Sequence, residues 1–359
     1  MKNRLEELDG LRGIFAILVI CYHFSQGPQF DPLSYTGNFV FRYSYIFVDF
    51  FFVLSGFVIA YSYSNRLSNT ASFIVFIKKR FIRLYPLLFY SVIVYVPLKV
   101  YGMFTSFDFN DGVYTVYNLI FESLDSLTFM NSTPILGSNE GMNPVSWSIS
   151  AEMIAYIYFG SIVLWLSKRY LLLIIGVVTT IFFFFLVYGH LQVSGSLGFL
   201  RGILGFSIGV LVYEVYKKTA TKPDLLEIPY LIILVMLFYL IDLNITSELI
   251  LIFPIWFGFG VFIFSKSNGY VSLLLRSRAV QFLGKISYSI YLNHFLVLWV
   301  TYFLFWKVLN LEVSGPTVVI SFILTIVITI VYSFFTHKFI EVKFAEWLKG
   351  KLLKERKKP

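Results

Sequence analysis

Long apolar stretches separated by short polar segments dominate this chain of 359 residues. A helix needs an apolar stretch of about 17 to 25 residues to cross the hydrocarbon core of a bilayer. Ten stretches fit this pattern, at approximately residues 11–26, 40–63, 84–104, 145–167, 170–188, 197–216, 228–243, 248–265, 286–306 and 315–337. The pattern predicts an all-α, polytopic integral membrane protein with about ten transmembrane helices.

The composition agrees with this prediction. Hydrophobic residues make up 58% of the chain and charged residues 14%, whereas a soluble globular chain is about half apolar and about a quarter charged. This balance argues against a disordered chain and a collagen-like chain. The single cysteine, Cys21, has no second cysteine with which to form an internal disulfide, so a disulfide scaffold is also excluded.

Basic residues collect on one set of the predicted loops. Segment 64–83 contains five Lys or Arg residues, and further basic groups begin at Lys168, Lys217, Lys266 and Lys338. Loop 105–144, on the opposite side, contains five acidic residues and no basic one. Because Lys and Arg concentrate in cytoplasmic loops, we expect both termini in the cytoplasm, which requires an even number of spans.

The net charge of +9 is then mainly a topology signal and an attraction to anionic lipids. Nucleic acid is not an expected partner, because its recognition needs basic side chains gathered on one soluble face. We expect residues 1–340 to form the ten-span membrane domain and residues 341–359 to form a basic cytoplasmic tail.

Three local signals concern individual helices. Asn143 followed by Pro144 predicts the N-cap and first residue of the fourth span. Gly56, after Ser55 in the second span, indicates close helix packing. In loop 105–144, four apolar side chains with helical spacing predict an amphipathic helix on the outer surface. These side chains are Tyr114, Tyr117, Phe121 and Leu124.

Ionisable side chains inside predicted spans are candidate functional residues, because a charge at bilayer depth is unfavourable. In the first span Asp9 is expected to cap the helix, and His23 lies eleven residues after Arg12, about 16.5 Å further along the helix. Asp49 and Glu152 lie within the second and fourth spans. Counted from the span ends, His23, Asp49 and Glu152 lie about 9, 13 and 12 Å below the outer surface, in one predicted layer.

Three arginines predict a second layer at the cytoplasmic face. Arg80 and Arg83 are three residues apart and share a helix face with each other, next to a bend expected at Pro86. Two guanidiniums on one face suit bidentate binding of a phosphate, and Arg12 lies at the same membrane edge. Each candidate has a structural alternative: positive-inside charge for the arginines, and a paired carboxylate for Asp49. For His23 the alternative is a hydrogen bond to a nearby carbonyl.

Five motifs follow one another along the chain. They are Arg12 and His23 with ten residues between them, Arg80-x-x-Arg83 followed by Leu84-Tyr85-Pro86, FFVLSGF at 51–57, SWSISAE at 146–152 and SYSIYLNH at 287–294. In this order they resemble the membrane-bound acyltransferases of family 3, the bacterial surface-carbohydrate O-acyltransferases. The resemblance covers the whole chain and is to members that lack a C-terminal SGNH-hydrolase-like domain.

The resemblance implies transfer of an acyl group, usually acetyl, from cytoplasmic acyl-CoA to a hydroxyl of a cell-surface or lipid-linked glycan across the bacterial inner membrane. It implies that His23 is catalytic and that Arg12, Arg80 and Arg83 bind the CoA end. His294 matches a family position without an assigned step. The implied partners are acyl-CoA, most simply acetyl-CoA, the glycan acceptor and membrane lipids.

The chemistry of the residues agrees with this reaction. The CoA phosphates need cations, the acceptor hydroxyl needs a base that titrates near neutrality, and Asp49 or Glu152 could orient the imidazole as a triad carboxylate does. A thioester is already activated and needs no metal, and the four histidines lack metal-ligand spacing. The alternatives are a glycan transporter or flippase, for which the expected repeats of broken helices are missing, and an inactive assembly subunit, which would tolerate loss of His23.

Overall fold

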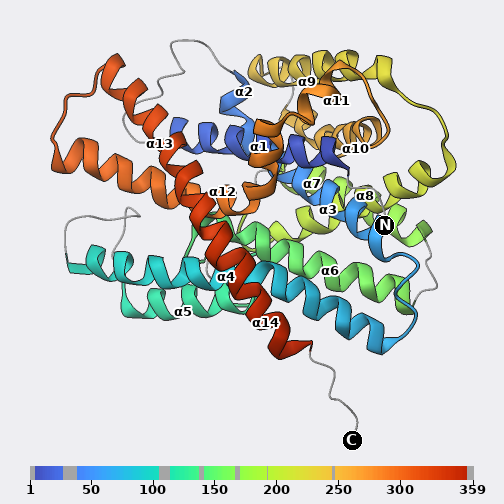
Figure 1. Cartoon of the computed structure of the whole chain (residues 1–359), viewed down its shortest axis with the longest axis horizontal. Coiled ribbons are helices and arrows are strands. Elements are labelled where there is room, and N and C mark those ends of the chain that lie inside the picture. Colours follow the sequence, from blue (N-terminus) through green and yellow to red (C-terminus); the bar gives the residue numbers. More distant parts are fainter. Residues whose placement is uncertain are drawn as a thin grey trace, which may run out of the picture. The chain divides into compact units, whose positions relative to one another are not determined.

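The computed structural model describes residues 5–26, 39–104, 114–136, 141–165, 170–191, 193–244 and 247–353. Within these ranges the chain is helical and contains no strand (Figure 1). The α-helices are α1 Glu6–Ser25, α2 Phe39–Arg42, α3 Phe47–Tyr63, α4 Thr70–Phe104, α5 Val116–Leu127, α6 Trp147–Trp165, α7 Tyr170–Val187, α8 Gly198–Lys218, α9 Glu227–Asp242, α10 Phe253–Phe264, α11 Tyr270–Leu275, α12 Arg278–Phe303, α13 Gly315–Thr336 and α14 Ala345–Leu352. Leu304–Val308 and His337–Phe344 are π-helical.

Eight helical stretches of the described chain are at least 18 residues long and apolar enough to cross a membrane. Two shorter apolar helices, Leu172–Val187 and Glu248–Phe264, coincide with the fifth and eighth predicted spans. The all-α, polytopic prediction is therefore confirmed. The side of each terminus and the crossing of the two shorter helices stay predictions. Lys168, Arg169 and the tail beyond residue 353 lie outside the described residues.

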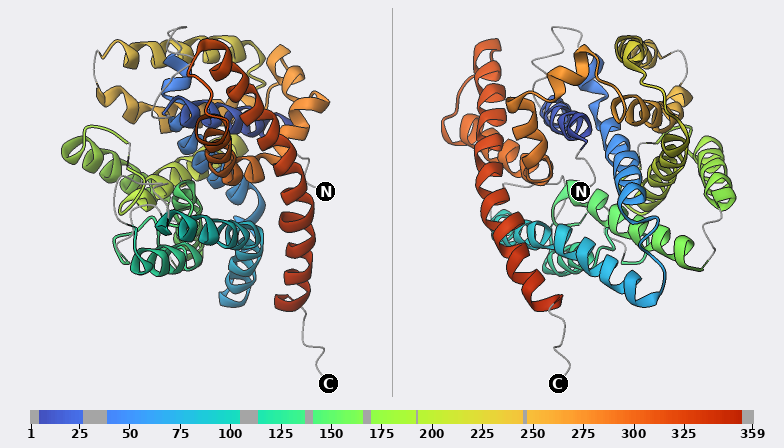
Figure 2. Two further views of the ribbon diagram at one scale, coloured as in Figure 1. Left: turned by 90° about the vertical axis from the view of Figure 1, so that its left-hand side faces the viewer. Right: turned by 45° about the vertical axis from the view of Figure 1, so that its right-hand side comes forward.

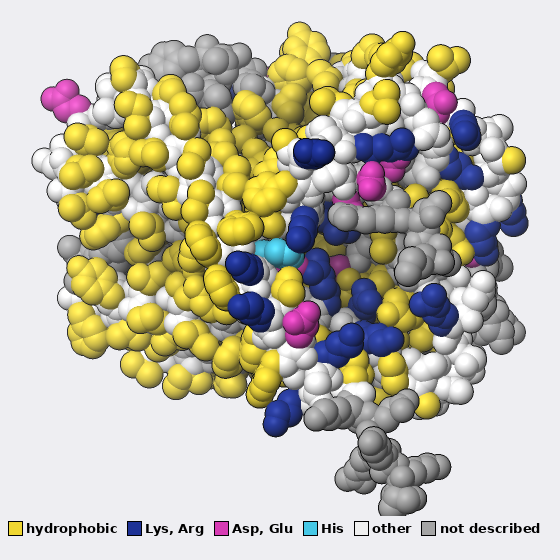
Figure 3. Space-filling view, in the orientation of Figure 1, with side chains coloured by type: hydrophobic (Ala, Val, Ile, Leu, Met, Phe, Trp, Pro, Cys, Tyr) yellow, Lys and Arg dark blue, Asp and Glu magenta, His cyan; other side chains and the backbone are white. Residues whose placement is uncertain are grey.

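Helix α13 shows how these helices differ from those of a soluble protein. Its exposed residues are apolar and recur about every four positions. Figure 3 shows hydrophobic side chains over this part of the surface. The exposed residues are Val319, Ile320, Ile323, Leu324, Val327, Ile328 and Val331. The buried side instead carries Ser321, Thr325, Thr329 and Ser333. An apolar outer face over small polar contacts is typical of a helix in lipid.

The described chain forms two compact units. The first unit consists of Met1–Tyr61, Tyr170–Leu191 and Leu204–Ser333. The second unit consists of Ser62–Arg169, Gln192–Ile203 and Phe334–Pro359. Of the candidate residues, Arg12, His23 and Asp49 belong to the first unit, and Arg80, Arg83 and Glu152 to the second.

In the first unit, α1 and α12 lie side by side (Figure 2). A Cβ atom added at Gly13 would lie 2.5 Å from the backbone nitrogen of Gly284, and one added at Gly284 would clash with the carbonyl oxygen of Asp9. Glycine therefore allows the two backbones to touch. The same device joins α3 to α8, because a Cβ at Gly56 would clash with the carbonyl oxygen of Phe206. This contact confirms the packing role predicted for Gly56.

The start of α1 differs from the prediction. The helix begins at Glu6 with Leu5 as its N-cap and has no side-chain cap, so the prediction that Asp9 caps it is wrong. Charged residues precede the apolar run and already belong to the helix. Asp9 instead forms an ion pair with Arg12, which lies one helical turn after it, at 3.7 Å.

In the second unit, α4 is 35 residues long and continues through Pro86 and Pro97. It therefore starts fourteen residues before the predicted span, and it carries Arg80 and Arg83 on a helical extension of that span. Proline removes one backbone donor at each site, but the helix is not interrupted at either. Helices α5, α6 and α14 and the π-helical segment His337–Phe344 contact α4.

The amphipathic helix predicted in loop 105–144 is present as α5. Tyr114 lies before this helix, and the location of the helix on the outer surface stays a prediction. Thr115 and Asn118 form a capping box at its start. An ion pair between the Lys99 ammonium and the Glu122 carboxylate, at 3.3 Å, connects α5 to α4. Tyr114 donates to the same carboxylate at 2.7 Å. Burial, and then the hydrogen bond to Glu122, raise the pKa of Tyr114 above its ordinary value, so this phenol keeps its proton. Helix α6 also begins as predicted, because Asn143 caps the turn that starts at Pro144.

Candidate functional site

Two histidines meet in the first unit. His23 lies near the end of α1, and His294 lies ten residues after Gly284 on α12. Their ring centroids are 5.1 Å apart and the ring planes are tilted by 38°. His294 is fully buried, whereas His23 is partly exposed. The sequence marked His294 only as a family position, and nothing in the spacing along the chain predicts that it faces His23.

Aromatic rings complete the surroundings of this pair. Tyr22 and Phe295 lie edge-on to the His23 ring, with centroid distances of 4.8 and 5.5 Å. The Nδ1 atom of His294 lies 2.6 Å from the carbonyl oxygen of Tyr291. The bond to a nearby carbonyl that was the structural alternative for His23 is thus found at the second histidine.

Asp49 and Arg12 also belong to the first unit. Asp49 lies in the first turn of α3 and is only 1% exposed. Its suggested role of orienting His23 stays a prediction. Arg12 is partly exposed and paired with Asp9, about three turns before His23 on α1. A cation and an imidazole thus lie on one helix, with ten residues between them.

In the second unit Arg80 lies among aromatic rings. Its guanidinium carbon is 5.2, 5.9 and 5.8 Å from the ring centroids of Tyr63, Phe76 and Tyr156, which is the range of cation–π contacts. One terminal nitrogen donates to the Tyr63 hydroxyl at 3.2 Å. Among the described atoms, the buried Nε of Arg80 has no hydrogen-bond acceptor. Arg80 as a residue is partly exposed, and its planar cation suits an anionic or carbonyl ligand.

Glu152 is connected to this cluster by one side chain. The Tyr156 hydroxyl donates to the Glu152 carboxylate, and the Tyr156 ring also faces Arg80. The sequence placed Arg80 at the cytoplasmic edge and Glu152 in the outer layer. In the second unit a single tyrosine contacts both. Tyr156 was missed because nothing in its apolar sequence context sets it apart.

Arg83 has a different partner from Arg80. Its guanidinium forms an ion pair with Glu341, a buried carboxylate from the π-helical segment. His337 lies one turn earlier, and its Nδ1 is 2.9 Å from the second oxygen of Glu341. The Arg83 side chain is 41% exposed and so remains accessible. The sequence assigned Glu341 to the tail, so this pair was not predicted.

Within the described ranges, no set of three or more His, Cys, Asp or Glu side chains is arranged to hold a metal ion.

Comparison with known proteins adds three findings. The family model described as "Acyltransferase domain" matches residues 5–335, a range that includes both histidines and all three arginines. The chain is 33% identical over 154 residues to "Protein 2 in picA locus" of Rhizobium radiobacter, an alignment that covers 41% of this chain and 76% of that protein. No solved structure matches the chain.

Proposed function

Because this chain belongs to the family of that acyltransferase domain, we propose that it transfers an acyl group from cytoplasmic acyl-CoA to a hydroxyl of a cell-surface or lipid-linked glycan. Family membership makes it an acyltransferase that acts on groups other than aminoacyl groups. Its apolar helices make it a multi-pass membrane protein. Acetyl-CoA as the donor, the glycan as the acceptor and the bacterial inner membrane as the location belong to the proposal.

The observation that carries the proposal is the position of His23. It is a partly exposed imidazole on an apolar helix, inside the matched range and eleven residues after Arg12. An ionisable side chain within a membrane span is unfavourable, so it is a candidate functional residue. It is also the side chain best suited to exchange a proton near neutral pH.

The proposed reaction needs one base and no further reagent. His23 accepts the proton of the acceptor hydroxyl while the hydroxyl oxygen forms a bond to the thioester carbonyl carbon. The carbon–sulfur bond then breaks, and the CoA sulfur leaves with the proton that His23 returns. The products are a glycan ester and free CoA, so atoms and charge balance.

Cations are needed at the other end of the donor, where the CoA phosphates lie. We assign this role to Arg12, Arg80 and Arg83, since guanidinium matches phosphate in a bidentate way. The partial exposure of Arg80 and Arg83 supports the assignment. Membership in an acyltransferase family favours this reaction over the transporter and the inactive assembly subunit.

The test compares His23→Gln with the wild-type protein at equal abundance in the membrane. Glutamine keeps a polar side chain of similar reach but cannot exchange a proton near neutral pH. Because a general base contributes about 10²–10⁴-fold, glycan acylation measured by mass spectrometry of cell-envelope glycans should fall by that factor. His190→Gln, on the segment after α7, is the matched control and should acylate at the wild-type rate. A His23→Gln variant that acylates as fast as the wild type would show that His23 is structural.

A further inference from the structure

We propose that His294 is the positioning residue of His23: its Nε2 atom accepts a hydrogen bond from the His23 imidazole and fixes the nitrogen that faces the acceptor hydroxyl. This inference rests on the proposed role of His23 as base. It assigns to a second histidine the orienting role that the sequence left open between Asp49 and Glu152.

The first step is the tautomer of His294. Its Nδ1 lies 2.6 Å from the carbonyl oxygen of Tyr291. A carbonyl oxygen can only accept, so Nδ1 carries the hydrogen and donates it. In a neutral imidazole the other nitrogen is then an acceptor. The Nε2 atom of His294 is therefore a lone-pair acceptor whose orientation is held by the backbone of α12.

The second step is that the Nε2 atom of His294 is an unused acceptor on a ring that lies next to the His23 imidazole. Nε2 of His294 is buried and has no hydrogen-bond partner among the described atoms, which is unfavourable for a buried polar group. The His23 ring is its imidazole neighbour, with a centroid separation of 5.1 Å. Two imidazoles joined edge to edge by an N–H···N bond of about 2.9 Å have a separation of this size. The second side-chain torsion of histidine is soft, so we infer that the His23 ring can turn one nitrogen toward this acceptor.

The third step is the register of the two helices. Gly13 of α1 meets Gly284 of α12, and each histidine lies ten residues beyond its glycine. Both helices therefore run in the same direction, and the histidines reach equal height about 15 Å from the glycine contact. A slip of one residue on either helix would turn one ring away by about 100°.

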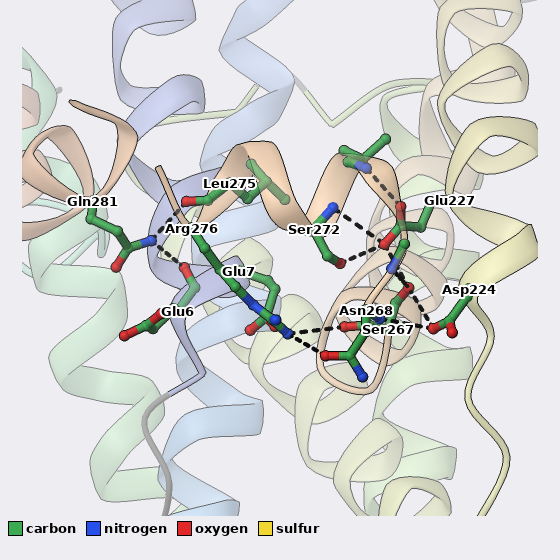
Figure 4. A network of polar contacts seen from close by, with 12 residues as sticks. Glu6, Glu7, Asp224, Glu227, Ser267, Asn268, Ser272, Leu275, Arg276 and Gln281 are labelled. Carbon is green, nitrogen blue, oxygen red and sulfur yellow. Dashed lines mark hydrogen bonds and ion pairs between the residues drawn. The ribbon is translucent and has the colours of Figure 1, made fainter. Parts of the chain in front are cut away.

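Polar contacts at the other end of α1 hold this register (Figure 4). Gln281, near the start of α12, donates to the carbonyl oxygens of Glu6 at 2.6 Å and Leu275 at 2.8 Å. Arg276 donates through Nε to Glu7 at 2.6 Å. These bonds connect the first turn of α1 to the segment that leads into α12. The histidine pair is thus fixed by one glycine contact and two side chains far from it.

The chemistry of the pair follows from the tautomer. With His294 accepting at one nitrogen of His23, the other nitrogen is unprotonated and able to take the hydroxyl proton. Once His23 is protonated, it donates to His294 through the same bond. The transferred proton stays on His23 until the CoA sulfur takes it, and His294 keeps its own proton on Nδ1. His294 differs from a triad carboxylate because it orients the base without adding a negative charge.

Two substitutions separate positioning from simple loss of volume. In His294→Gln the side-chain oxygen can take the place of Nε2 and accept from His23. In His294→Asn the amide can take the place of Nδ1 and donate to Tyr291, but no acceptor reaches His23. The Gln variant should keep kcat within about threefold of wild type. The Asn variant should lose about 10- to 100-fold in kcat, the size of one hydrogen bond to a charged group, with KM for acetyl-CoA unchanged. Equal activities of the two variants would overturn the proposal.

A readout independent of activity distinguishes this inference from the proposed function. The chain has four histidines, so ¹⁵N-histidine NMR of the protein in lipid bilayers can be assigned with single His→Gln variants. We expect His294 in the Nδ1-protonated tautomer, and His23 nitrogen signals that shift in His294→Asn but not in His190→Gln. A wild-type protein with this coupling but without acyl transfer would refute the proposed function alone. If the wild-type protein is active but the His23 signals do not change in His294→Asn, the positioning role alone is refuted.

Discussion

Arg83 and Glu341 form an ion pair that connects the Arg-x-x-Arg motif to a segment that the sequence assigned to the tail. Glu341 is buried and accepts from both Arg83 and His337, so its charge is compensated on two sides. Arg83 is partly exposed, and the same guanidinium is one of those we assign to the CoA phosphates. An anionic ligand at Arg83 therefore competes with a carboxylate already in place.

This competition predicts the effect of Glu341→Gln. The substitution keeps a hydrogen-bond acceptor for Arg83 and removes the negative charge. KM for acetyl-CoA should fall by about two- to fivefold, because a partly exposed ion pair contributes only about 0–1 kcal/mol. Steady-state kinetics of the purified protein in lipid nanodiscs measure the change. Glu346→Gln, an exposed carboxylate on α14, is the control and should leave KM unchanged. A higher KM in Glu341→Gln would mean that Glu341 orients Arg83 for the phosphate.

Arg80 allows a second prediction at this scale. Its planar group stacks among three aromatic rings, and an ammonium group lacks both the plane and the fork of donors. We expect Arg80→Lys to lower kcat/KM for acetyl-CoA about tenfold and Arg80→Ala to lower it further, with unchanged amounts of protein in the membrane. Full activity of Arg80→Lys would show that only positive charge is needed at this membrane edge.

The sequence singled out individual side chains but not their neighbours. His23, Arg80 and Arg83 stand out because each is ionisable beside or within an apolar run. Their partners do not stand out. Tyr156 is one of 25 tyrosines, and Glu341 is 258 residues away from Arg83. Such contacts depend on how helices pair in space, and a single sequence contains no direct signal for that pairing.

At the scale of the elements, apolar runs located the helices but not their ends. Helix α4 begins at Thr70, fourteen residues before its apolar run, and α1 begins at Glu6, five residues before its run. The length of an apolar run is set by the thickness of the hydrocarbon core. A helix can continue beyond that core into water, so the run does not mark where the helix ends. Asp9 was mistaken for a cap for the same reason. The cap at Asn143 was predicted correctly. The capping box of α5 was not predicted, although it too depends on neighbouring residues only.

The contact between α1 and α12 gives the prediction for elements. In Gly13→Ala the added methyl would lie 2.5 Å from the backbone nitrogen of Gly284, so the helices must separate. We expect a loss of about 1–3 kcal/mol in stability, seen as a lower thermal unfolding midpoint in detergent, and reduced acyl transfer. Gly350→Ala is the control, because nothing lies within 4 Å of the added atom. An unchanged midpoint in Gly13→Ala would show that the two backbones are not held in this contact.

On the scale of the whole chain, the distribution of polarity separates membrane-facing from buried surface. The outward side of α13 is apolar, while its buried side makes polar contacts, such as Thr325 with Thr301 at 2.9 Å. This arrangement is the reverse of a helix in a soluble protein. It agrees with the composition, which predicted the class of protein correctly without any knowledge of helix pairing.

The number of membrane crossings is a property of the whole chain that labelling can measure directly. With ten spans, loop 105–144 lies outside and the segment after Lys218 lies inside. If α7 and α10, the two shorter helices, did not cross, the count would be eight. Both termini would stay inside, and only segments such as 219–223 would change sides.

With ten spans, we expect Thr221→Cys, in a chain whose Cys21 is replaced by Ala, to resist a membrane-impermeant maleimide in intact cells. Glu312→Cys, in a loop that is outside with either count, should be labelled, and Lys349→Cys should react only after the cells are opened. Labelling of Thr221→Cys in intact cells would reduce the crossings to eight, whereas labelling of Lys349→Cys would reverse the whole topology and place Arg12, Arg80 and Arg83 on the side opposite to cytoplasmic acyl-CoA.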